Sequence, residues 1–386
     1  MSLVRIKDIC KINPQKEKAT GKVSFIKMED VSIDGRILNK EEKNYEDVST
    51  GFSAFKDKDV LVAKITPCFE NGKGAYVDGL LNGVGFGSTE FHVVRADERK
   101  ILSKYLFYHL NCKTFRKYGE INMTGSAGQK RVPKDFIEKY KIFLPSMTEQ
   151  EKIVEILSTW DLAIEKQEQL IEKKKEFKKG LMQRLLSGEF RFKEFKDKWK
   201  TIKLGEAFKE RKETGFIDLE LLAITTANGV VRRTEVDVKD TSSEDKSKYK
   251  RILPGDIGYN TMRMWQGVSG LSKYEGIVSP AYTILKPMDN INSLYMSYLF
   301  KVPKIINLFY RHSQGLVSDT LNLKYENFKG IKVCIPNSIE EQKKIADVFV
   351  NCDKEIELLE KELEALKLQK KGLMQRLLTG ELRVKV

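Results

Sequence analysis

The stretch KKGLMQRLLSGEF at residues 178–190 recurs almost unchanged as KKGLMQRLLTGEL at residues 370–382. Eleven of the thirteen positions are identical, and the second copy stands 192 positions after the first in a chain of 386 residues. The similarity continues toward the N-terminus, where LPSMTEQEKIVEILSTW at 144–160 corresponds to IPNSIEEQKKIADVFVN at 335–351. The sequence therefore predicts an internal repeat, with two halves built to one plan.

Both repeated segments have the pattern of a long α-helix. A proline precedes each segment, and Glu149 or Glu341 stands in the first turn, where the helix dipole favours a carboxylate. Apolar residues recur at alternating spacings of four and three, with three interruptions in the first segment and one in the second. Gly188 and Gly380 suit the left-handed position that ends a helix. We expect two long helices with a coiled-coil seam.

A globular stretch precedes each helix. Short runs of β-branched and aromatic residues between Gly, Asp and Asn turns predict strands, whereas 101–110 and 291–300 have a helical pattern. We predict an α/β (α+β) fold with two globular domains and two long helices in a pseudo-two-fold internal repeat. The predicted boundaries are 1–147 for the first domain, 148–187 for the central helix, 188–338 for a linker and the second domain, and 339–386 for the C-terminal helix and tail.

The composition narrows the class of protein. Apolar residues make up 41% of the chain, as in globular proteins. Because we find neither an 18-residue apolar window nor a signal-peptide pattern, we expect a cytoplasmic protein without a membrane span. Five cysteines without C-x-x-C spacing and three histidines make a zinc site improbable. The net charge of +14 favours a polyanionic partner, although a merely lysine-rich protein is the plain alternative.

The motifs of catalysis are not found in the sequence. The glycines at 83, 85 and 87 lack the Gly-Lys-Ser/Thr ending of a phosphate-binding loop and the dinucleotide spacing. No methyltransferase tetrad, zinc-protease motif or nucleophile elbow is present. We therefore predict no catalytic residues, no metal ligands and no cofactor on this chain.

Basic and amide side chains form several candidate DNA-binding clusters. Residues 166–203 contain thirteen basic and six acidic side chains. Arg pairs with guanine and Gln with adenine at base edges, whereas Lys mainly holds phosphates. An exposed charge is more often simply solvated. The candidates, all in predicted loops, are Gln129, Lys130, Arg131, Arg232, Arg233, Arg263, Gln266, Arg311 and Gln314.

The repeated stretch also contains polar residues that coiled-coil formation does not explain. Its leucines continue the apolar stripe of the helix. Gln183 and Arg184, however, recur as Gln375 and Arg376. Two identical polar edges suggest two identical contacts with another molecule, so we take these four residues as a candidate partner interface.

This pattern resembles that of the specificity subunits of type I restriction-modification systems. The resemblance covers essentially the whole chain and is carried by the Leu/Ile-Pro…Glu-Gln helix starts and the KKGLMQRLLxGE endings, although the Pro-to-Gln spacing differs by one residue between the halves. It implies two target-recognition domains that each read one half of a split, asymmetric site on double-stranded DNA. It also implies that the helices pack antiparallel as a spacer.

The resemblance further implies which partners the chain has. Two modification subunits that use S-adenosylmethionine would dock on the helices, and ATP-dependent restriction subunits, with their Mg, would join for cleavage. Two other readings stay open at this point. One is a methyltransferase or nuclease whose active site escapes motif analysis, and the other is a coiled-coil scaffold whose globular domains bind proteins.

Overall fold

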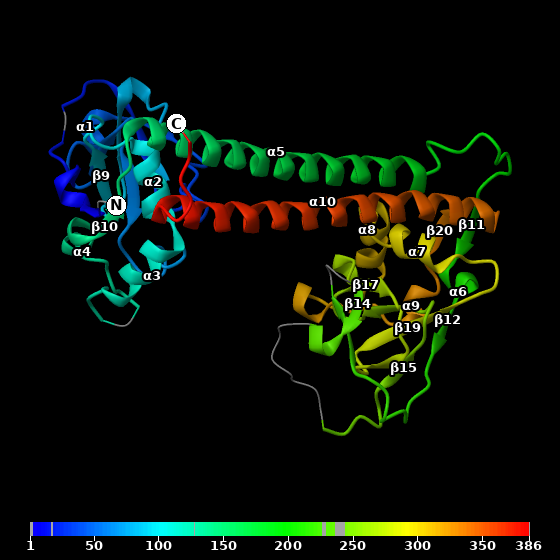
Figure 1. Ribbon diagram of the computed structural model, residues 1–386. Helices are drawn as coiled ribbons and strands as arrows, with labels where there is room; N and C mark the ends of the chain where they lie inside the picture. The colour runs from blue at the N-terminus through cyan, green and yellow to red at the C-terminus, as the bar shows by residue number, and fades with distance from the viewer. Residues whose placement is uncertain (1–2, 17, 127, 226–228, 236–243, 386) are drawn as a thin grey trace. The chain divides into compact units, whose positions relative to one another are not determined.

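The computed structural model describes residues 3–16, 18–126, 128–225, 229–235 and 244–385. The chain divides into two compact units, one formed by residues 1–168 with 361–386 and the other by residues 169–360. Two long helices, α5 (Met147–Leu186) and α10 (Ile339–Thr379), each contribute one part to each unit (Figure 1).

The first unit contains two four-stranded sheets and a short antiparallel pair. Strand β6 (Val60–Ala63) is buried along its whole length, which explains its uninterrupted apolar sequence. It lies in an antiparallel sheet of order β2-β9-β6-β7, with β2 at Cys10–Ile12, β9 at Phe91–Ala96 and β7 at Gly74–Tyr76. The second sheet has the order β4-β3-β8-β5, with bounds Glu41–Asn44, Lys22–Ile26, Val84–Gly87 and Ser53–Lys56. Strands β1 (Leu3–Arg5) and β10 (Lys141–Phe143) form the pair.

The helices of the first unit close its core against both long helices. The domain contributes α1 (Tyr45–Val48), α2 (Ser103–Asn111), α3 (Lys113–Ile121) and α4 (Lys134–Lys139), with 3₁₀ turns η1 (Ile6–Asp8) and η2 (Leu81–Gly83). Its largest buried cluster includes Ile153 and Leu157 of α5 together with Leu377 and Leu378 of α10. The start of one long helix and the end of the other are thus part of the same hydrophobic core.

The second unit repeats this plan with changes outside the central sheet. Its main sheet has the order β12-β19-β16-β17, which matches the order of the first unit, with bounds Phe208–Arg211, Tyr282–Pro287, Ile257–Asn260 and Ser269–Leu271. The pair β11–β20 (Lys200–Lys203 and Lys332–Ile335) corresponds to β1–β10. Two further antiparallel pairs are β13–β14 (Leu222–Thr225 and Gly229–Arg232) and β15–β18 (Lys250–Ile252 and Gly276–Val278).

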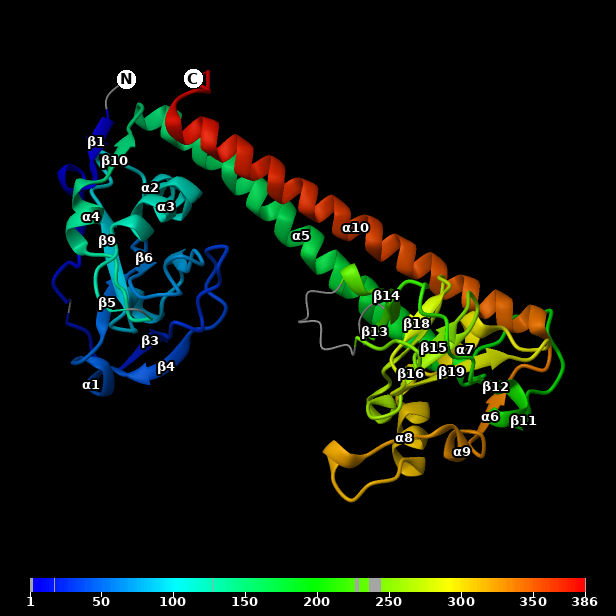
Figure 2. The same ribbon diagram turned by 90° about the horizontal axis from the view of Figure 1, so that it is seen from below.

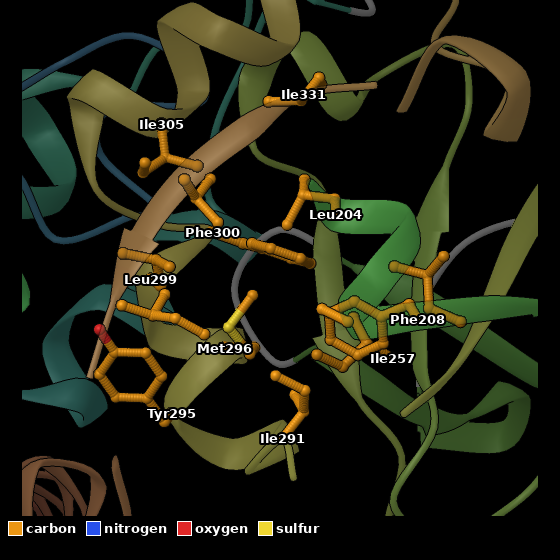
Figure 3. Close-up of a cluster of buried hydrophobic side chains, with 14 of the residues drawn as sticks. Leu204, Phe208, Ile257, Ile291, Tyr295, Met296, Leu299, Phe300, Ile305 and Ile331 are labelled. Carbon is orange, nitrogen blue, oxygen red and sulfur yellow. The ribbon is translucent and has the colours of Figure 1, made fainter. Parts of the chain in front are cut away.

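The core of the second unit combines aliphatic side chains with several aromatic rings. Phe300 lies among aliphatic side chains in the core (Figure 3), and its ring meets that of Phe309 edge to face at 5.3 Å. The cluster extends to Leu185 of α5 and Phe349 of α10. The shorter helices around it are α6 (Leu204–Ala207), α7 (Ser293–Leu299), α8 (Pro303–His312) and α9 (Tyr325–Phe328), with 3₁₀ turns η3 (Arg233–Glu235), η4 (Met264–Gln266) and η5 (Ser318–Thr320).

Within each unit, segments of α5 and α10 lie side by side in both views (Figures 1 and 2). Their contacts run in opposite directions along the chain, so the segments are antiparallel. Every residue that interrupts the apolar pattern makes a polar contact across the seam. Gln167 donates to Glu362 at 3.0 Å, Lys174 pairs with Glu355 at 2.6 Å, and Lys178 and Lys370 pair with Asp353 and Asp161.

The predicted mixed fold, with two similar domains and two long helices that pack antiparallel, is confirmed. None of the helices in the described part of the chain has an apolar stretch long enough to cross a membrane.

Candidate nucleic-acid and partner interfaces

Three contacts recur in both units, and we call them joints. The first joint connects the start of one long helix to the residues that follow the other long helix. Glu149 in the first turn of α5 accepts two hydrogen bonds from Arg383, from Nε at 2.7 Å and from Nη2 at 2.7 Å. In the second unit, Glu341 of α10 accepts the same pair from Arg191 at 2.8 Å each. Both carboxylates are buried, and such two-pronged bonds combine charge with a fixed geometry.

The second joint connects each long helix to its own domain. Gln150 is fully buried; its Oε1 accepts from the backbone N–H of Leu102 at 2.9 Å, and its Nε2 donates to the carbonyl of Pro145 at 3.1 Å. Gln342 repeats both bonds, with the N–H of Asn292 at 2.9 Å and the carbonyl of Pro336 at 3.0 Å. The difference of one residue in the Pro-to-Gln spacing therefore leaves this contact unchanged.

The third joint brings all three parts of each unit together. Asp161 of α5 accepts from the hydroxyl of Tyr108 on α2 at 2.7 Å and pairs with Lys370 of α10. Asp353 of α10 accepts from Tyr298 on α7 at 2.7 Å and pairs with Lys178 of α5. One carboxylate thus holds the domain and both helical segments.

The role of these joints was not predicted from the sequence. Glu149 and Glu341 were expected to stabilise the helix dipole, and Arg191 and Arg383 were not among the candidate residues. The signal was available, because the two arginines are themselves 192 positions apart and extend the repeat beyond KKGLMQRLLxGE. Part of the basic run at 166–203 is explained by ion pairs, since Lys174, Lys178 and Arg191 pair with carboxylates of α10.

The candidate partner residues lie on equivalent exposed edges of the two helix ends. Gln183 and Gln375 are exposed. Arg184 and Arg376 are also exposed, but each pairs with the glutamate five residues later, Glu189 at 3.7 Å and Glu381 at 3.0 Å. These ion pairs at the helix ends therefore explain part of the reason why arginine recurs at both positions.

The same helix ends each contain a glycine that the fold itself does not require. Gly180 and Gly372 lie inside α5 and α10, where glycine costs about 1 kcal/mol relative to alanine. A Cβ at either position would meet nothing within 4 Å. The space above both glycines is open, so neither is needed for a close approach within its own unit.

Four of the candidate DNA-binding residues come together in the second unit. Arg263 and Gln266 are exposed on the connection between β16 and β17, which contains η4. Arg311 lies in the last turn of α8, and Gln314 follows the helix. The two segments adjoin, because the Trp265 and Tyr310 rings are 6.3 Å apart and the N–H of Leu323 donates to the carbonyl of Thr261 at 2.8 Å.

Lys301 supports the connection that carries Arg263. Its Nζ donates to the carbonyls of Gly267 at 2.8 Å and Ser269 at 2.7 Å. Burial lowers the pKa of Lys301 to about 8, because the ammonium loses water without gaining a carboxylate. Lys301 is thus a structural cation behind the exposed surface.

The other two candidates of the second unit lie elsewhere. Arg232 ends β14, pairs with Glu220 at 3.5 Å and stacks over the Tyr274 ring at 5.2 Å. Arg233 begins η3. Tyr274 follows β17, whereas Arg263 precedes it, so Arg232 and Arg263 lie toward opposite ends of that short strand.

The three candidates of the first unit differ from one another. Gln129 and Lys130 are exposed, and the carbonyl of Lys130 accepts from the N–H of Thr66 at 3.0 Å, beside the connection between β6 and β7. Arg131 is bound through two bonds of 2.9 Å to Glu90, which holds the pKa of that carboxyl below its usual value. The guanidinium of Arg131 is therefore already committed within the domain.

The same two places adjoin in both units: the connection between the third and fourth strands of the main sheet, and the segment after the helix that follows α2 or α7.

The model of the family "Type I restriction modification DNA specificity domain" matches residues 1–173 and again residues 196–368. The chain belongs to this family. The family's domain therefore occurs twice, in agreement with the internal repeat.

Several relatives are named as specificity subunits of type I restriction enzymes. The specificity subunits of the EcoAI and EcoEI restriction enzymes of Escherichia coli are 45% and 41% identical over 150 and 155 residues. These matches cover 38% and 39% of this chain but only about a quarter of each relative. The MjaVIII specificity subunit of Methanocaldococcus jannaschii is 30% identical over 314 residues, which cover 73% of this chain and 70% of the relative.

Solved structures of specificity subunits have the same fold. A chain from a study of complex assembly in a type I R-M system matches with a TM-score of 0.61 and 16% identity over 99% of this chain and 98% of the other. The S subunit from M. genitalium matches with a TM-score of 0.55 and 15% identity over 98% and 96% of the two chains. The HsdS subunit of Thermoanaerobacter tengcongensis has a TM-score of 0.51 at 16% identity, over 99% and 97% of the two chains.

Proposed function

We propose that this chain is the DNA-recognition subunit of a type I restriction-modification complex and that it performs no catalytic step itself. The observation that carries the proposal is the double match of the DNA specificity domain, once in each half of the chain. The absence of catalytic motifs from the sequence is consistent with it. Location in the cytoplasm is part of this proposal.

Each domain reads one half of a bipartite, asymmetric target on double-stranded DNA. In the second unit, Arg263, Gln266, Arg311 and Gln314 combine exposed base-reading groups with the aromatic rings of Trp265 and Tyr310. In the first unit, Gln129 and Lys130 occupy the equivalent place. Arg131 and Arg232 are weaker candidates, because each already pairs with a carboxylate. Arg233, next to Arg232, is the remaining candidate of the second unit.

The long helices set the distance between the two half-sites. Their seam contains polar contacts at Gln167, Lys174, Lys178 and Lys370, which specify one register, since a shift along the seam would leave these groups without their partners. A spacer of defined length needs such a register.

Two copies of a modification subunit dock on the repeated helix ends. Gln183 with Arg184 and Gln375 with Arg376 present the same exposed groups, and Gly180 and Gly372 leave room for a close approach by another backbone. S-adenosylmethionine, ATP and Mg are bound by the modification subunits and by ATP-dependent restriction subunits, not by this chain.

The test is to express the chain with the modification subunit of its own system and map methylated sites across a genome. We expect one bipartite motif with a fixed unread spacer, and no methylation when this chain is omitted. Methylation without a sequence preference, or a preference that does not depend on this chain, would contradict the proposal. Charge reversal at both Arg184 and Arg376 should weaken assembly, because a mispaired charge at an interface costs several kcal/mol.

A further inference from the structure

A pocket of about 650 Å³ opens in the first unit between α3, β10 and the end of α10. Four lysines line it, Lys113 and Lys117 of α3, Lys141 of β10 and Lys371 of α10, together with His109 and Gln375. We call this the basic pocket. It includes one of the residues of the repeated helix ends, Gln375, and it lies wholly within one compact unit.

The charge of the basic pocket is unbalanced. No Asp or Glu is among the residues that line it. The four lysines are exposed, and no ion pair joins any of them to a carboxylate among the described residues. This differs from the seam, where Lys174, Lys178 and Lys370 are all paired. The lysines of the pocket are available to an anionic partner.

The rim of the basic pocket is apolar. The side chains of Leu3, Tyr118 and Ile121 line it and are 64%, 56% and 72% exposed. Grouped exposed apolar side chains are typical of a protein interface. A DNA backbone offers phosphates to lysines but little that would cover leucine and isoleucine, so the rim favours a polypeptide over a nucleic acid.

A buried histidine in the wall has one ring nitrogen without a hydrogen-bond partner. His109 is 4% exposed, and its Nε2 has no hydrogen-bond partner among the described atoms. Burial lowers the pKa of His109 to about 3, so the ring is neutral at physiological pH.

We propose that the basic pocket binds an acidic segment of the modification subunit, with carboxylates on the lysines and an apolar side chain on the rim formed by Leu3, Tyr118 and Ile121. The inference rests on the proposed function, since it supposes that a modification subunit docks on these helix ends. It adds the chemistry of one contact and assigns that contact to the first unit.

The second unit keeps only part of this pocket. Lys141 and Lys371 correspond to Lys332 and Lys179. With the helices aligned on the tyrosines of the third joint, Tyr108 and Tyr298, the residues Lys113, Lys117 and His109 correspond to Pro303, Asn307 and Leu299. The two copies of the modification subunit are therefore bound unequally, and the copy on the first unit is bound more tightly.

The experiment compares the full chain with the double variant Lys113→Glu, Lys117→Glu in titrations with the purified modification subunit. Native mass spectrometry counts the bound copies, and calorimetry measures each affinity. We expect two unequal affinities for the parent chain. The variant should lose the tighter one by at least about tenfold and keep the weaker one, with an unchanged melting temperature because both lysines are exposed.

The matched control is Lys7→Glu, Lys11→Glu, which makes the same charge change on exposed lysines of the same domain and should leave both affinities unaltered. Equal affinities in the parent chain, or an unchanged tight affinity in the variant, would overturn the pocket proposal while leaving the proposed function intact. Normal assembly with lost DNA binding would assign the pocket to DNA instead. A parent chain that binds no modification subunit would overturn both proposals.

Discussion

Glu149 and Arg383 are 234 positions apart in the sequence and are joined by two hydrogen bonds of 2.7 Å. Glu341 and Arg191 form the same joint in the second unit at 2.8 Å. The Glu in the first turn of each long helix and the Arg after each KKGLMQRLLxGE stretch are therefore two sides of one contact. Each side occurs twice, which accounts for the recurrence of this Glu and this Arg in both halves of the chain.

Replacement of Arg383 by Gln should destabilise the first unit by about 1 to 3 kcal/mol, because the buried carboxylate of Glu149 loses its charged donor. Arg191→Gln should have a similar effect on the second unit. Chemical denaturation measures both. The exposed Arg99, which pairs with Asp97 two residues before it, supplies the control Arg99→Gln, for which we expect little change. Equal stability of all three variants would contradict a structural role for the joint.

The same joint predicts a pH dependence. The hydrogen bonds from Arg383 hold the pKa of Glu149 below its usual value. A carboxyl whose pKa is lower in the folded state stabilises the fold above its unfolded pKa of about 4.3, and this stability is lost as the pH falls through the folded pKa. The difference in unfolding free energy between the parent chain and Glu149→Gln should thus shrink from pH 6 toward pH 3. A constant difference across this range would exclude the linkage.

The purified chain alone should neither methylate nor cut DNA, with or without S-adenosylmethionine, ATP and Mg. The reason is that its sequence contains none of the motifs that such reactions use. Transfer of labelled methyl groups and plasmid nicking are sensitive measurements. Turnover by a preparation shown by mass spectrometry to contain no partner subunit would make the chain an enzyme.

Arg263→Ala should relax the preference at one base position of one half-site, at a cost of about 1 to 3 kcal/mol, if its guanidinium contacts a guanine. Lys130→Ala should instead weaken binding to all sequences alike and reduce the salt dependence. Binding of the assembled complex to a library of randomised sites measures both. A change in both half-sites after Arg263→Ala would contradict the assignment of one half-site to each domain.

Substitutions at Gly180 and Gly372 should change stability and assembly in opposite directions. Substitution of both by alanine should raise the unfolding free energy by up to about 2 kcal/mol, since each position is helical and open. The same change should weaken binding of the modification subunit, because a Cβ blocks the close approach. A more stable chain that assembles with unchanged affinity would show that no partner approaches these glycines.

Lengthening both long helices should lengthen the unread spacer of the DNA target. We would insert four helix-forming residues after Glu168 in α5 and before Lys361 in α10, which preserves the pairs of Asp161 with Lys370 and Lys178 with Asp353. The insertion adds about 6 Å and about 40° beyond a full turn. The mapped spacer should grow by roughly one or two base pairs with both half-sites unchanged.

The control for this experiment inserts the four residues into α5 alone, which shifts one side of the seam against the other. That variant should lose stability, because the polar pairs no longer meet. Full activity of the doubly lengthened chain on the original spacer would show that the helices do not set the distance.

The sequence by itself determined the local structure and the repeat. The alternating apolar spacing and the glycines at 188 and 380 specify long helices with defined ends, because these signals act within a few residues of the chain. The internal repeat could be recognised because both copies contain the same local signals. For the candidate DNA-binding residues, the sequence showed the residue types and their spacing. It did not show which side chains are already paired within the protein.

Tertiary structure alone decided which parts of the repeat belong together. Read along the chain, each domain is followed by its own helix, yet Glu149 binds Arg383 and not the nearer Arg191. It also decided that Arg131 is occupied by Glu90, 41 positions away, whereas Arg263 stays exposed. These choices depend on groups that only folding brings within hydrogen-bonding distance, and no local pattern encodes which of several carboxylates a given arginine will meet.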